Sequence, residues 1–299
     1  MPSFSTIVNF FTPWDLSPTV LIACAAVFAF YVRGMFLTHA RGESTGFWRA
    51  TAFLLSVLSI YLFMQTRLDY WSQHMFWVHR LQHLFLHHLA PFLIALSAPV
   101  VVLRRGTPDW LREKILLPIW HFPVTRMIYR IVQNPVIATF LFVGLIWFWL
   151  MPSIHFKAML SVDRYKAMNW SMLIDGLLFW WLIIGPPKQS SLKPLHYGFR
   201  VLILWIVVVP QLLIGAYIAL SSHILYSVYN VCGRAWPISP MTDQELGGLI
   251  TWIPSCMMSV VAQIIVIYRW MHQSEEEYAL SQSNPAPETQ THDPETVTP

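Results

Sequence analysis

Seven apolar stretches constrain this chain more than any other feature, because each can cross the roughly 30 Å hydrocarbon core of a membrane as an α-helix. Only 11% of the residues are charged, against about a quarter in an ordinary soluble domain. Backbone polar groups find no water inside a bilayer, so stretches of this kind must be helical. The sequence therefore predicts an all-α fold, a polytopic transmembrane bundle of seven helices. The stretches are residues 17–33, 47–66, 74–103, 135–151, 168–185, 199–222 and 248–271.

The distribution of Lys and Arg predicts the orientation of this bundle, because short cytoplasmic segments retain basic residues. With the N-terminus outside, thirteen of the nineteen fall in inside segments and five in outside segments, and Arg80 lies within a span. A basic region before the first apolar stretch is missing, so we expect no cleavable signal. We predict an N-terminus outside and a C-terminus in the cytoplasm.

The composition changes after the last apolar stretch, and this change divides the chain. We predict that residues 1–273 form the transmembrane domain. Residues 274–299 contain six acidic residues and four prolines, which is typical of a disordered, acidic cytoplasmic tail. The formal charge of +4 arises mainly from loops and favours anionic lipid headgroups of the bilayer. No recognition motif accompanies it, so we expect no binding of nucleic acid.

The third apolar stretch carries the polar chemistry, since five of the twelve histidines lie between residues 74 and 88. Polar groups inside a membrane are costly and usually functional. Met75, His79, His83 and His87 recur at four-residue steps, which places them along one stripe of an α-helix. Thioether and imidazole ligands both suit copper, and imidazole also suits zinc and haem iron. The stripe predicts a metal site.

Polar residues elsewhere are predicted to join or support this site. His155 and His223 lie after the fourth and sixth stretches, on the predicted outer side with the stripe. Asp175 lies well inside the fifth stretch, where it either pairs with Arg80 or a histidine, or fixes the tautomer of a metal-bound imidazole. Asp243 precedes an apolar run, so it is either part of the first turn of its own helix or a functional polar partner.

The sequence offers little support for catalysis or for other metal sites. Cys24, Cys232 and Cys256 are far apart and form no CxxC pair, so their spacing does not indicate a zinc or redox centre. Ser221 and Ser222 precede His223 without an acidic partner in the sequence, and this is too common a pattern to indicate a hydrolase. We therefore expect a protein that is not an enzyme.

Three motifs in order along the chain resemble the CtaG-type cytochrome c oxidase assembly factors. They are His79-x-x-x-His83 followed by Ala90-Pro91, the FWW run at residues 179–181, and the run LYSVYNVCGRAWPISPMTDQELGGLITWIP at residues 225–254. The resemblance implies a multi-pass protein of the bacterial inner membrane, needed for active haem-copper oxidase and linked to copper supply. It also implies oxidase subunits or other copper-handling assembly proteins as partners. Many relatives carry a Glu-His pair where this chain has Asn169-Trp170, so a metal site that depends on the pair is altered here.

Several functions therefore stay open at this point. In the first, His79 and His83 bind copper near the outer face, assisted by Met75, His87, His155 or His223. In a second, the histidines form a hydrogen-bonded seam between helices. A transporter of copper or another small solute is a third, since prolines interrupt three spans. A haem-binding redox protein is the last, based on His74 and His88, although no second helix offers a matching pair.

Overall fold

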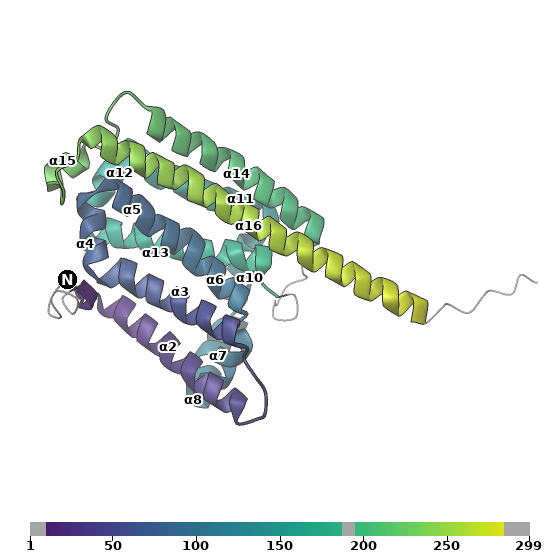
Figure 1. Ribbon diagram of the computed structural model, residues 1–299. Coiled ribbons are helices and arrows are strands. Elements are labelled where there is room, and N and C mark those ends of the chain that lie inside the picture. The colour runs from purple at the N-terminus through teal and green to yellow at the C-terminus, as the bar shows by residue number, and fades with distance from the viewer. Residues whose placement is uncertain (1–9, 187–194, 284–299) are drawn as a thin grey trace, which may run out of the picture.

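The computed structural model describes residues 10–186 and 195–283, with side chains up to residue 276, and every element in these ranges is a helix (Figure 1). The α-helices are α2 (Pro18–His39), α3 (Phe47–Gln65), α4 (Arg67–His74), α5 (Phe76–His83), α6 (Ala90–Ser97), α7 (Val100–Gly106), α8 (Asp109–Leu111), α9 (Leu117–His121), α10 (Pro123–Val132), α11 (Pro135–Leu150), α12 (Pro152–Met159), α13 (Val162–Ile184), α14 (Tyr197–Leu220), α15 (Val228–Cys232) and α16 (Pro240–Ser283). Two π-helices, η1 (Leu84–Leu89) and η2 (Arg112–Leu116), interrupt this series. The prediction of an all-α fold is confirmed for the described residues.

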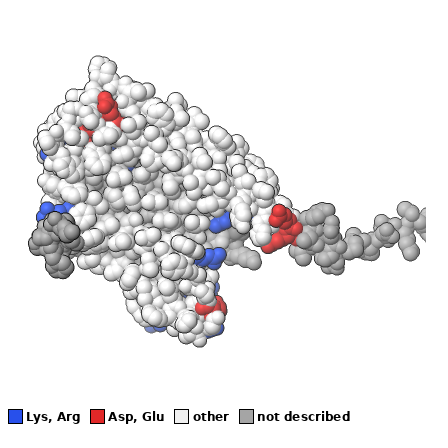
Figure 2. Space-filling view, in the orientation of Figure 1, with Lys and Arg blue, Asp and Glu red and all other residues white. Residues whose placement is uncertain are grey.

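The described residues contain five helices long and apolar enough to span a membrane, or up to seven spans if each of two bent pairs counts as one. The five are α2, α3, α13, α14 and α16. Two further spans would be bent pairs, in which α7 turns by 77° from the segment 76–97 and α11 turns by 73° from α10. Figure 2 shows a broad middle surface without Lys, Arg, Asp or Glu and charged residues mostly toward its edges. The chain is therefore a multi-pass membrane protein, whereas the count of seven spans and the orientation stay predictions.

The third predicted span is not one helix, and this correction matters for the site. Met75 is extended, with φ −139° and ψ 125°, so it separates α4 from α5. Beyond α5, η1 widens the helix, and Ala98 at φ 52° ends α6 before the bend into α7. Pro91 has no N–H for the carbonyl of His87, four residues earlier, and a local π-helix is one way to accommodate such a gap. The histidines therefore do not follow one uninterrupted α-helical stripe.

The ends of the bundle differ in their elements. In Figure 1, α4, α12 and α15 lie at one end, which we call the α4 end, and α7, α8 and α10 lie toward the other. The α4 end is the one predicted to face outward. Helix α16 continues past residue 273, where we drew the boundary between bundle and tail, and projects from the bundle as far as Ser283. Residues 284–299 of the predicted tail lie outside the described residues.

Candidate metal-binding site

Three imidazoles from two separate parts of the chain come together at the α4 end of the bundle. The ring centroid of His79 lies 4.3 Å from that of His83 and 5.1 Å from that of His155. His79 and His83 lie one turn apart on α5, and α12 supplies His155. All three side chains are buried, with exposures of 0%, 1% and 1%. We call these three residues the histidine cluster.

His79 is the residue of the cluster whose bonding is incomplete. Neither of its ring nitrogens has a hydrogen-bond partner in the described part of the chain, although both are buried. The carbonyl of Ser72 lies near the ring without forming a hydrogen bond to it. Burying an unpaired polar group costs about 1–3 kcal/mol, so such groups are rare and call for an explanation. A free imidazole lone pair is also what a soft metal ion binds.

The hydrogen bonds of His83 fix its tautomer. Nη1 of Arg80 lies 3.2 Å from Nδ1 of His83, and a guanidinium can only donate. Nδ1 must therefore accept, which leaves the proton on Nε2, where it is donated to Oδ1 of Asn169 at 3.2 Å. Arg80 also donates from Nε to the hydroxyl of Thr251 at 2.8 Å. The lone pair of His83 is thus occupied by a cationic donor.

His155 is held in the opposite tautomer. Its Nδ1 lies 3.1 Å from the carbonyl of Trp149, to which it donates, and its Nε2 accepts from the hydroxyl of Tyr229 at 2.9 Å. Burial lowers the pKa of His155 to about 3, so the ring is neutral at physiological pH. Burial also raises the pKa of Tyr229 well above its usual value, which keeps its hydroxyl protonated as the donor.

The cluster as it stands is not assembled as a metal site. No group of three His, Cys, Asp or Glu side chains among the described residues is arranged to hold an ion. One lone pair is free, on His79, and two more, on His83 and His155, accept from Arg80 and Tyr229. If the Arg80 guanidinium and the Tyr229 hydroxyl move aside, three neutral imidazole nitrogens become available to bind a metal ion. The residues fit a soft, low-charge ion such as Cu(I) better than a hard cation.

His87 belongs to a different group, which is a correction to the predicted stripe. Its Nε2 lies 2.9 Å from Oδ2 of Asp175, and its ring stacks on Phe142 at 4.2 Å. Its neighbour His88 has a ring centroid 5.0 Å away. The widened turns of η1 rotate His87 away from the cluster. Asp175 therefore contacts a histidine rather than Arg80, which both a structural pair and an acid that fixes the tautomer of an imidazole would show.

The local fold explains why His87 sits where it does. The carbonyl of His87, which Pro91 leaves without its helical partner, accepts instead from Nε1 of Trp180 at 3.2 Å. Gly176 allows this approach, because a Cβ there would lie 2.4 Å from the same carbonyl oxygen. Helix α13 thus meets η1 at backbone distance.

The remaining predicted ligands are Met75 and His223. Met75 is fully buried at the N-cap of α5, one turn before His79, whose backbone N–H donates to the Met75 carbonyl at 3.0 Å. His223 lies in the loop after α14 with an exposed side chain, and its backbone carbonyl accepts from Gln244 at 3.0 Å. The structure therefore gathers His79, His83 and His155 around one point, while His87 and His223 have other surroundings.

Asp243 supports the site in a way that its local sequence does not suggest. Its carboxylate accepts from the backbone N–H groups of Phe76 and Trp77 at 3.0 and 2.9 Å, and it pairs with Arg234. It therefore caps the N-terminus of α5 from the first turn of α16, and favourable charge at this position stabilises the helix that carries His79.

Asp69 is a buried polar centre that sequence reasoning missed. It is 7% exposed, and its carboxylate accepts from Tyr165 at 2.7 Å, Gln82 at 2.9 Å and Gln73 at 3.0 Å. These contacts join α4 to α5 and α13 directly beside the cluster. A single acid next to a basic residue gives no sequence signal for such a role.

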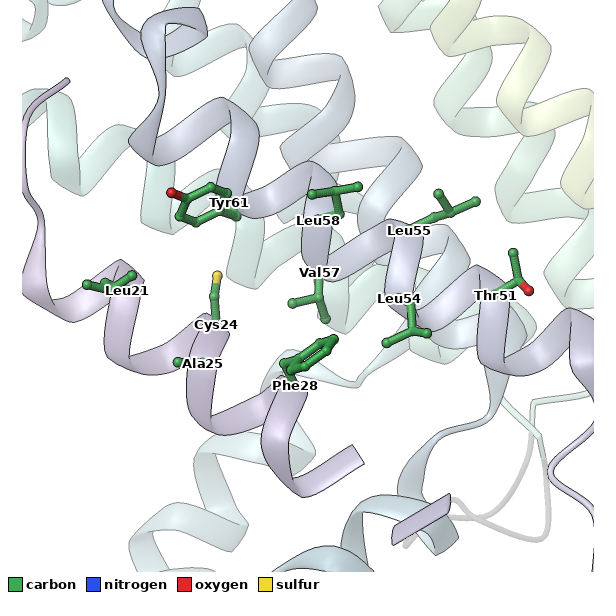
Figure 3. Close-up of a pocket in the computed structure, with 10 residues that line it drawn as sticks. All are labelled: Leu21, Cys24, Ala25, Phe28, Thr51, Leu54, Leu55, Val57, Leu58 and Tyr61. Carbon is green, nitrogen blue, oxygen red and sulfur yellow. The ribbon is translucent and has the colours of Figure 1, made fainter. Parts of the chain in front are cut away.

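A pocket of about 550 Å³ opens beside Asp69, and two of the residues that line it also contact the histidine cluster. Tyr165 and Asn169 both line it, and they contact the cluster from their other sides. Met64 and Met159 contribute thioethers to its wall. A second cavity of about 480 Å³ lies between α2 and α3, where Figure 3 shows a mostly apolar lining with Cys24 and Tyr61. The first pocket is the one connected to the histidines.

Comparison with known proteins places the chain in a family. A sequence model described as cytochrome c oxidase caa3 assembly factor (Caa3_CtaG) matches residues 29–273. The chain belongs to this family. Uncharacterized proteins of Mycobacterium leprae (strain TN) and Mycobacterium bovis (strain ATCC BAA-935 / AF2122/97) are 24% and 25% identical over 290 and 288 residues. Each match covers 91% of this chain and 42% of the relative, so the chain spans less than half the length of these curated relatives.

No solved structure matches the chain significantly. For this Caa3_CtaG protein, the histidine cluster lies within the matched range, as do Arg80, Asn169 and Asp243. The resemblance noted above from sequence motifs is thereby confirmed. Asn169 is the residue that accepts from His83.

Proposed function

We propose that this protein is a cytochrome c oxidase assembly factor that binds copper in transit at His79, His83 and His155. The family supports the assembly pathway. In this proposal copper is the cargo rather than a resident catalyst. The observation that carries the proposal is His79, a fully buried imidazole with two unpartnered nitrogens beside two further imidazoles. No catalytic step is required of the chain.

The chemistry of the cluster supports transient rather than permanent binding. The donors Arg80 and Tyr229 occupy the lone pairs of His83 and His155, so both compete with an incoming ion. The guanidinium charge of Arg80 also repels a cation at Nδ1 of His83. An ion bound against such competition is released more readily, which suits a protein that passes its cargo on to oxidase subunits or other copper-handling assembly proteins.

The pocket beside Asp69 supports access from the α4 end, which we infer faces the periplasm of a bacterial inner membrane. Met64 and Met159 line it with thioethers, which are copper ligands. Tyr165 and Asn169 both line the pocket and contact the cluster. A copper ion would thus meet soft ligands before it reaches the imidazoles.

Oxidase activity in membranes of a deletion strain tests this proposal. We expect activity to fall without the protein and to recover in part when copper is added to the medium. Complementation with His79→Ala should resemble the deletion, while the matched variant His223→Ala should restore activity. Full oxidase activity without the protein, at low copper, would contradict the proposal.

A further inference from the structure

A second polar pocket lies far from the histidine cluster, where α2 meets α7 and α8. Its volume is about 640 Å³, and its lining holds five arginines and one acid, Asp109. Figure 2 shows Lys and Arg at the lower edge of the molecule, over this region of Figure 1. The arginines are Arg33, Arg41, Arg104, Arg105 and Arg112. We call this the arginine pocket.

The walls of the arginine pocket are held at a fixed distance. A Cβ at Gly34 would lie 2.0 Å from the carbonyl oxygen of Val102, and one at Gly106 would lie 1.8 Å from that of Phe30. Helices α2 and α7 therefore touch backbone to backbone on this side. Arg33 ties them further by donating to the carbonyl of Gly106 at 2.7 Å. The pocket is thus a built feature of the fold rather than a chance grouping of surface side chains.

The charge in the arginine pocket is only partly balanced by the protein. Arg105 pairs with Glu43 at 2.7 Å, and Arg112 pairs with Asp109 at 2.8 Å and Glu113 at 3.1 Å. Within the described residues, the guanidinium groups of Arg41 and Arg104 form no ion pair or hydrogen bond, although the backbone N–H of Arg41 donates to Thr38. Three carboxylates thus pair with only two of the five guanidinium groups, and Arg33 is bonded to a carbonyl. Arg41 and Arg104 are exposed and able to bind an anion.

We propose that the arginine pocket binds the phosphate headgroup of an anionic phospholipid. Guanidinium groups bind phosphate oxygens in pairs, and basic pockets beside spanning helices are typical sites for anionic headgroups. The same pocket has an apolar rim of Leu37, Val100 and Val101, each about two-fifths exposed, against which acyl chains can lie. This rim favours a lipid over free phosphate.

Lipid binding to the detergent-purified full chain tests the proposal. We expect phosphatidylglycerol to bind the wild type at least tenfold more tightly than phosphatidylcholine, measured by native mass spectrometry. The double variant Arg41→Gln/Arg104→Gln should lose about tenfold in affinity for phosphatidylglycerol. The matched variant Arg126→Gln/Arg130→Gln removes equal charge from exposed positions of α10, outside the pocket, and should lose less than twofold.

Two outcomes would overturn this inference. Equal losses in the two double variants would mean that the chain attracts anionic lipid by overall charge alone. Inorganic phosphate that displaces the lipid at equal concentration would assign the pocket to a soluble phosphate instead. Arg41→Lys/Arg104→Lys, which keeps the charge, should retain most of the affinity and shows that the Gln variant fails for lack of charge.

Discussion

At the scale of single residues, the histidine cluster is defined by which lone pairs are free. His79 has no partner, whereas His83 and His155 each accept from one donor. The position of each proton follows from what its neighbours can donate, because a guanidinium and a protonated tyrosine hydroxyl supply the hydrogen. The affinity of the cluster for copper should therefore respond to those donors as well as to the histidines.

Tyr229→Phe tests this dependence. The substitution removes the hydroxyl that donates to Nε2 of His155, at 2.9 Å, and keeps the ring. Because a hydrogen bond of this kind is worth about 1 kcal/mol, we expect Cu(I) to bind about fivefold more tightly. A competition titration with a chromophoric Cu(I) chelator measures the change. Tyr226→Phe is the matched control, since the Tyr226 hydroxyl donates to the carbonyl of Leu150 and not to a histidine; unchanged or weaker binding in Tyr229→Phe would count against the cluster.

Asp69 makes stability depend on pH. Burial raises its pKa from 3.8 to about 6, against the lowering effect of hydrogen bonds from Tyr165, Gln82 and Gln73. Between these two values the folded state binds more protons than the unfolded state, so the contribution of Asp69 to stability falls as pH rises. From pH 7 to pH 5 we expect the wild type to gain about 1 kcal/mol relative to Asp69→Asn. Thermal unfolding in detergent at both pH values checks this, and a constant difference between the two proteins would refute it.

At the scale of elements, the segment from α4 to α6 is broken at three points, each with a separate cause. Asp243 caps α5 after the break at Met75, Pro91 lies just beyond the π-helix, and Ala98 ends α6 with a positive φ. The contact of Gly176 on α13 with the carbonyl of His87 then holds η1 in place. These breaks decide that His87 leaves the cluster while His79 and His83 stay.

Gly176→Ala tests the close approach of α13 to η1. The new Cβ would lie 2.4 Å from the carbonyl oxygen of His87, so one of the two helices must move, and overpacking of this kind costs about 1–3 kcal/mol. We expect a lower midpoint of thermal unfolding. Gly144→Ala is the matched control, because its Cβ would lie 3.8 Å from Phe140 and alanine favours the helix by up to about 1 kcal/mol. If Gly176→Ala melts at or above the wild-type midpoint, the two backbones are not in contact.

The sequence predicts the elements of this fold better than their connections. Apolar length places all seven stretches close to helices or bent pairs, because the bilayer imposes that length locally. The cap of α5 is different, since it joins Phe76 to Asp243 from the far end of the chain. Likewise the sequence predicts His155 on the same side of the bundle as the other histidines, but its contact with His79 depends on how α12 packs. Asp69 and Tyr165 gave no signal, because their hydrogen bonds join three elements.

At the scale of the whole molecule, the account depends on which end of the bundle faces outward. Single-cysteine variants in a Cys24→Ser/Cys232→Ser/Cys256→Ser background test this in intact cells. Because the basic loops favour a cytoplasmic location for α7 to α10, we expect a membrane-impermeant maleimide to label Arg67→Cys and not Arg126→Cys. Both positions are exposed in the structure, so burial does not interfere. The reverse labelling pattern would place the histidine cluster near the cytoplasm and remove the proposed access from the periplasm.

The two ends of the bundle also carry different chemistry. Neutral imidazoles, thioethers and Asp69 lie at the α4 end, while the arginine pocket lies near α7 and α8. The proposed copper site and the proposed lipid site are therefore independent. A variant that loses copper binding should still bind lipid, and a variant that loses lipid binding should still bind copper. Binding at the unaltered site therefore shows that each variant is folded.

Copper bound to the detergent-purified protein tests the central claim most directly. The wild type, His79→Ala/His83→Ala and the control His223→Ala would be loaded with Cu(I) under reducing conditions, desalted and analysed for metal by mass spectrometry. The account predicts about one copper per chain in the wild type and in His223→Ala, and less than a tenth of that in the double variant, since too few imidazole donors are left to hold the ion. Equal copper in all three proteins would contradict it.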